Sequence, residues 1–117
     1  MFLLGLAALI AAGAFIFYAV AMTIKWIRNK IREKLALKKA KKTALADIKD
    51  LVKNSPNRKS LEDLERLASK EGATHFMVTL DDNNEVMGDL ELIKDSNNKL
   101  PEVRNLLGRE GMVVVEK

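Results

Sequence analysis

The acidic turn at residues 81–85 is the part of the chain whose residue types come closest to a metal site. Asp81, Asn83 and Glu85 place oxygen ligands at positions 1, 3 and 5, as the start of a calcium-binding loop does. The match then fails, because Val86 stands where the loop needs Gly, and Leu92 stands where it needs a bidentate Glu. The sequence therefore predicts a plain turn here, and we expect no metal.

The rest of the chain offers little for catalysis. It contains one His and no Cys, which excludes disulfides, thiolate chemistry and a multi-histidine metal site. His75 has no partner that the sequence can define, and no Ser lies in a nucleophile motif. No pair of acids has a spacing that singles it out for acid–base work. We expect no catalytic residue and no cofactor, and we predict that the protein is not an enzyme.

Positive charge is concentrated in one segment. Residues 25–42 hold nine Lys and Arg against one acid, a net charge of +8, whereas residues 43–117 have a net charge of −4. Only Trp26 lies nearby as an aromatic platform, so nucleic acid is not an expected partner. The cations follow an uncharged run, and an aromatic ring suits the headgroup region. We therefore predict a membrane-interface site for lipid, made of Lys25, Trp26, Arg28, Lys30, Arg32 and Lys34.

The uncharged run predicts a transmembrane helix over residues 1–24. A helix needs about 20 apolar residues to cross a bilayer, and no charged stretch precedes the run as a signal peptide requires. Cations on one side predict a single-pass protein with the N-terminus outside and the C-terminus cytoplasmic. Small residues on one stripe predict helix–helix packing and a homo-oligomer. That stripe is Gly5, Ala8, Ala12 and Ala19.

The helix is predicted to continue into the cytosol. Residues 25–53 contain no Gly or Pro and consist of strong helix formers, with apolar residues at helical spacing. This predicts a long basic juxtamembrane helix over 25–53. Pro56 then disfavours helix, so that residues 54–59 form a linker.

Residues 60–117 predict a small cytosolic α+β domain of order α-β-β-α-β. Alternation over 74–80 and 85–93 predicts two strands of a hairpin, Pro101 opens a short helix, and 112–115 forms an apolar last strand. We expect a three-stranded, mainly antiparallel sheet in which the last strand lies antiparallel beside the first. His75, Met77 and Thr79 alternate with the apolar set and are predicted to face outward as a possible partner face.

These features predict a membrane-anchored scaffold. It would oligomerise through the spanning helix and present its small domain to a protein partner on the cytosolic side. A bacterial inner membrane and a membrane-containing phage particle both suit this build, and the sequence does not choose between them. The alternative is a ligand-gated membrane-disrupting effector. In that case the cytosolic domain senses a signal, and the spanning helices, which pack through their small residues, rearrange to breach the bilayer.

Overall fold

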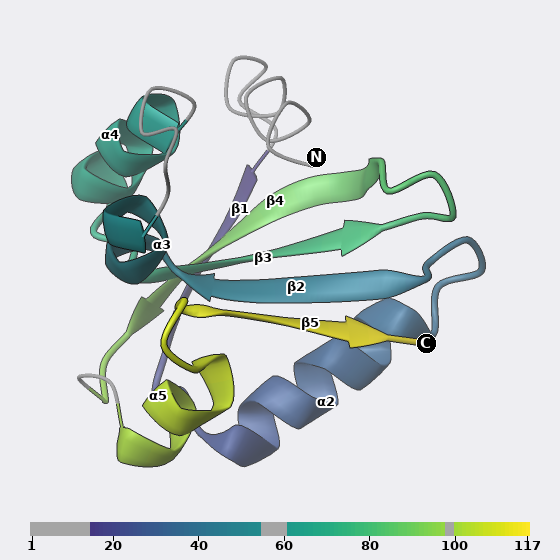
Figure 1. The fold of residues 1–117 in the computed structure, drawn as a ribbon, viewed down its shortest axis with the longest axis horizontal. Coiled ribbons are helices and arrows are strands. Elements are labelled where there is room, and N and C mark those ends of the chain that lie inside the picture. Colours follow the sequence, from purple (N-terminus) through teal and green to yellow (C-terminus); the bar gives the residue numbers. More distant parts are fainter. Residues whose placement is uncertain (1–14, 55–60, 98–99) are drawn as a thin grey trace.

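The computed structural model describes residues 15–54, 61–97 and 100–117, which form a five-stranded mixed sheet with helices on both faces (Figure 1). The strands are β1 (Phe15–Val20), β2 (Lys42–Asp47), β3 (His75–Leu80), β4 (Val86–Asp95) and β5 (Met112–Glu116). The helices are α2 (Ile24–Leu35), α3 (Ile48–Asn54), α4 (Glu62–Glu71) and α5 (Pro101–Leu107).

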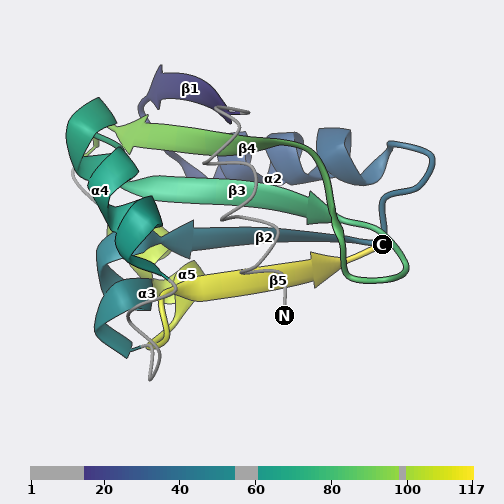
Figure 2. The same cartoon turned by 90° about the horizontal axis from the view of Figure 1, so that it is seen from above.

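The strands lie in the order β1-β4-β3-β2-β5, with β1 and β5 at opposite edges (Figure 2). β1 runs parallel to β4, and every other neighbouring pair is antiparallel. Side chains alternate between two buried layers. One layer contains Phe76 and packs against α3 and α4, whereas the other contains Met77 and packs against α2 and α5.

The predicted transmembrane helix over 1–24 is wrong in the part that the structure describes. Phe15–Val20 is the strand β1, paired with residues 90–95 of β4. A separate helix begins at Ile24, where the Thr23 hydroxyl accepts from the amide of Trp26 at 3.1 Å. None of the helices in residues 15–54, 61–97 and 100–117 has the length and apolar composition needed to cross a bilayer. The predicted single-pass localisation, with the N-terminus outside and the C-terminus cytoplasmic, depended on this helix and is wrong for the same reason.

The predicted continuous helix over 25–53 is also wrong. α2 ends at Leu35, where the amide of Ala36 donates to the carbonyl oxygen of Arg32 and the amide of Leu37 donates to that of Lys34. The next six residues turn the chain into β2, which lies between β3 and β5. Pairing with two strands outweighs the helix propensity of this Ala- and Leu-containing segment, because propensity differences are only tenths of a kcal/mol per residue. Of the predicted linker 54–59, only Asn54 lies among the described residues, and it ends α3.

Five elements follow residue 60 in the predicted order, as α4, β3, β4, α5 and β5. The predicted three-stranded sheet is nevertheless wrong, because β1 and β2 belong to the same sheet. β5 does not lie beside β3, since β2 occupies that place and pairs antiparallel with both. The edge strand β5 therefore pairs with β2, a segment for which the sequence pattern predicted a helix.

Gly111, which precedes β5, is expected to tolerate no side chain. Its φ is +78°, and an added Cβ would clash with the Cβ of Asp50. We expect Gly111→Ala to lower the free energy of unfolding by about 2–4 kcal/mol, through left-handed strain and overpacking together. Gly72→Ala is the matched control, because its φ is +74° but its Cβ would meet only Lys94 Cδ, at 3.9 Å. It should lose about 1 kcal/mol. If urea denaturation gave equal losses of unfolding free energy for Gly111→Ala and Gly72→Ala, the close packing at Gly111 would be contradicted.

Candidate functional site

β5 forms an edge of the sheet, and its backbone groups alternate in direction. The amide of Asp47 donates to the carbonyl oxygen of Gly111 at 2.7 Å, and the amide of Lys117 donates to that of Lys41 at 2.8 Å. In an antiparallel pair the bonded positions repeat every second residue, so the odd-numbered residues of β5 bond to β2. The even-numbered residues direct their N–H and C=O groups away from the sheet. They are Met112, Val114 and Glu116.

An apolar groove of about 630 Å³ lies between β5 and α2. Val113 and Val115 share the α2 side of the sheet with Leu45, and both are half-buried. Figure 2 shows α2 behind the inner strands of the sheet and α5 behind the first residues of β5. The apolar lining is Ile27, Ile31, Leu35, Ala36, Leu106, Val113 and Val115.

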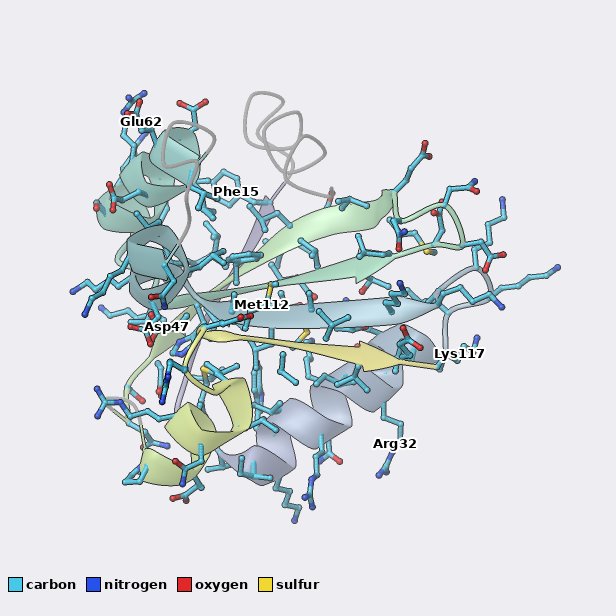
Figure 3. All side chains as sticks on the ribbon, in the orientation of Figure 1. Phe15, Arg32, Asp47, Glu62, Met112 and Lys117 are labelled. Carbon is cyan, nitrogen blue, oxygen red and sulfur yellow. The ribbon has the colours of Figure 1, made fainter. Side chains whose placement is uncertain are left out.

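The charged residues at the groove give it a positive rim. Arg28 and Arg32 are exposed, and neither forms an ion pair with any residue in the described part of the chain. The one acid, Glu116, lies 3.8 Å from the ammonium of Lys42. Figure 3 shows Arg32 extending from α2 away from the sheet and Lys117 at the end of β5. The rim thus carries two guanidinium groups beside the edge strand β5, together with the ammonium of Lys117, which donates to the carbonyl oxygen of Leu37 at 3.3 Å.

A buried carboxylate on β4 holds α2 in the orientation that forms this groove. Glu91 is 3% exposed, and its Oε1 lies 2.9 Å from Lys34 Nζ and 4.0 Å from Lys30 Nζ. The hydroxyl of Tyr18 donates to the same oxygen at 3.1 Å. Burial lowers the pKa of Lys34, but the hydrogen bond and the charge of Glu91 outweigh it and leave this pKa above its ordinary 10.5. Lys30 and Lys34 thus face β4, whereas Arg28 and Arg32 line the groove.

A second polar cluster joins the ends of β2, β3 and β4. Thr74 Oγ1 lies 2.7 Å from His75 Nδ1, accepts from the Asp95 amide at 3.0 Å, and donates to the Ile93 carbonyl at 3.2 Å. The hydroxyl has one proton, and a carbonyl can only accept. When the hydroxyl donates to the Ile93 carbonyl, His75 Nδ1 is the donor to Thr74 Oγ1 and does not take a proton from it. His75 Nε2 lies 3.7 Å from Asp47 Oδ2. Thr, His and Asp have the composition of a catalytic triad, but their hydrogen bonds join strands instead.

The predicted partner face of β3 is wrong. His75, Met77 and Thr79 are 1%, 0% and 5% exposed. Met77 packs in the same buried layer as Ile27 and Ile31 of α2. The prediction assumed a sheet with one solvent-exposed face. Helices cover both faces of this sheet, so both alternating sets of β3 side chains are buried.

The other predicted residues fall into three groups. Lys25, Arg28 and Arg32 are exposed on α2, and Trp26 is half-buried against the layer beneath that helix. Ala19 is exposed in β1, opposite Lys94, and not on a spanning helix. Three members of the small-residue stripe lie outside the described residues. These are Gly5, Ala8 and Ala12.

In the acidic turn, the carboxylate of Asp81 accepts hydrogen bonds from the backbone of the turn itself. Asp81 Oδ1 accepts from the amides of Asn83 at 2.9 Å and Glu85 at 3.0 Å. Among the residues that the structure describes, no three His, Cys, Asp or Glu side chains gather closely enough to hold a metal. The turn is an Asx motif that joins β3 to β4.

Comparisons of the chain with protein-family models, with curated proteins and with solved structures find no match. Its function must be inferred from the geometry of this chain alone.

The ion pair of Glu91 makes the stability of the protein depend on Lys34. We expect Lys34→Met to lower the free energy of unfolding by about 1–3 kcal/mol, because Glu91 stays buried without its nearest partner. Lys25→Met, an exposed change on the same helix, should stay within about 0.5 kcal/mol of wild type. Since the pKa of Lys34 is raised, its contribution is complete below 10.5 and is lost as the pH rises through the folded value. We expect the difference in free energy of unfolding between wild type and Lys34→Met to be smaller above pH 10.5 than at pH 7, as measured by denaturation at both pH values.

The protonation of His75 can be observed directly, because it is the one His of the chain. We expect ¹⁵N ring shifts to place a proton on Nδ1, and we expect that proton to exchange slowly with water. Thr74→Ala should speed its exchange, whereas Thr74→Ser, which keeps the hydroxyl, should not. A neutral ring with its proton on Nε2 alone would contradict this assignment and would leave Nδ1 able to accept the proton of Thr74.

Proposed function

We propose that the protein is a non-enzymatic interaction module that binds a partner protein in extended form, with one strand of the partner added to the outer edge of β5. The observation that carries this proposal is the set of outward backbone groups of Met112, Val114 and Glu116, placed beside an apolar groove. In strand addition, main-chain hydrogen bonds supply affinity and pockets for alternate side chains supply specificity. β5 and the α2 groove offer both.

The composition of β5 supports the same function. Sheet edges are commonly protected by Pro, by inward-pointing charges or by a bulge. β5 has none of these over Met112–Val115, and Val114 is 44% exposed at its centre. Its one charged residue, Glu116, stands at its C-terminal end, and Lys117 follows it. An apolar, regular edge of this kind favours pairing with another chain.

A partner strand would bury surface that is otherwise in contact with water. Its side chains on the α2 side would meet Val113 and Val115 and reach Leu106, which is 38% exposed. Each buried CH₂ group contributes about 0.8 kcal/mol, and each hydrogen bond about 0.5–1.5 kcal/mol net. Since ordering the partner opposes these gains, we expect affinities in the micromolar range, about −8 kcal/mol.

Val114→Pro tests the proposal, because it removes one outward N–H and leaves the bonds to β2 in place. Pro is accepted at an edge position whose N–H faces away from the sheet. Displayed random peptides selected on wild type should bind the Pro variant at least about tenfold more weakly, a loss of about 1.4 kcal/mol. Val114→Thr is the matched control, since it keeps the N–H and the β-branched shape, and it should bind like wild type. Thermal unfolding must show both variants folded.

Two results would overturn the proposal. Selected peptides that bind Val114→Pro as tightly as wild type would show that the β5 edge is not used. A wild-type dimer in sedimentation that the same change dissociates would show that a second copy of the chain occupies the edge.

A further inference from the structure

The cations around the groove indicate what kind of segment it takes. Resting on the proposed function, we infer that the strand added to β5 comes from an acidic partner segment, with an apolar side chain for the groove and two carboxylates for Arg28 and Arg32. The segment is extended, and its carboxylates stand two residues apart on the face that is turned toward α2.

Charge is the first support for an acidic segment. Two of the other cations nearby already have acidic partners, since Lys34 lies 2.9 Å from Glu91 and Lys42 lies 3.8 Å from Glu116. The ammonium of Lys117 donates to the carbonyl oxygen of Leu37 at 3.3 Å. Arg28 and Arg32 have none among the described residues, although both line the groove. A guanidinium binds a carboxylate through two parallel hydrogen bonds, which gives direction as well as attraction. The rim is therefore complementary to acids.

Spacing is the second support. Four residues of a helix rise about 6 Å, so Arg28 and Arg32 emerge about that far apart along α2. Alternate residues on one face of a strand stand about 6.7 Å apart. Two carboxylates at positions i and i+2 of an added strand would therefore match the two guanidinium groups, one to each.

The lining of the groove favours a peptide over a nucleic acid. Its inner surface is aliphatic, with Ile31, Leu106 and Val113 among the lining residues. Binding of single-stranded nucleic acid relies on aromatic side chains that stack on the bases, and the groove lining contains none. An apolar side chain and two carboxylates on the same face of the added strand satisfy both the aliphatic lining and the basic rim.

The experiment selects a displayed library of random ten-residue peptides on the wild-type protein. We expect the enriched peptides to contain Asp or Glu at positions i and i+2, with an apolar residue two positions before or after this pair, on the same face of the strand. The double change Arg28→Glu with Arg32→Glu should weaken them at least about tenfold, as expected for loss of two charge-assisted pairs. Lys38→Glu with Lys39→Glu is the matched control, because it changes the net charge equally at exposed residues outside the groove lining. Its effect should stay within about twofold.

The same library separates this inference from the proposed function. Enriched peptides that lack acids, or that bind the arginine double variant unchanged, would overturn the acidic segment; if they still lose binding with Val114→Pro, strand addition stands. Peptides insensitive to Val114→Pro would overturn strand addition itself. A single-stranded oligonucleotide that binds through Arg28 and Arg32 and ignores Val114→Pro would instead identify the rim as a nucleic-acid surface.

Discussion

One buried carboxylate links the first part of the chain to the sheet. Glu91 lies on β4, and the groups that satisfy it come from β1 and α2, since Tyr18 and Lys34 both reach its Oε1. A buried charge that loses its partners destabilises a protein, so the docking of β1 and α2 stabilises β4. This requirement holds α2 behind the inner strands of the sheet (Figure 2), where it forms one wall of the groove beside β5. The groove is thus a consequence of how Glu91 is satisfied.

The sequence was informative where the signals are local. Gly72 ends α4 with a φ of 74°, the carboxylate of Asp81 organises the β3–β4 turn, and Pro101 opens α5. Each of these acts within a few residues. β1 and β2 lack such signals. An apolar run such as Phe15–Val20 has the same composition in a spanning helix and in a buried strand, and β2 lies in a stretch of good helix formers. Pairing with residues far away in the chain decided both.

The candidate site was out of reach for a related reason. The cations of α2 look equivalent in the sequence, yet the turn of the helix sends Lys30 and Lys34 to Glu91 and leaves Arg28 and Arg32 at the groove. The stripe of Ile27 and Ile31 was visible as helical spacing. Its position beside β5 was not, because these elements are separated by about two thirds of the chain and meet only through the sheet order.

The alternation along β5 also divides its amides into two populations with different lifetimes against exchange with solvent. Those that donate to β2 are released only when the sheet opens, whereas those on the outer edge can exchange from the native state. In the free protein, fast-exchanging and slow-exchanging amides therefore alternate along β5. A strand bound at the edge would slow the exchange of the fast set, so hydrogen exchange along β5 reports whether the edge is occupied, without any added label.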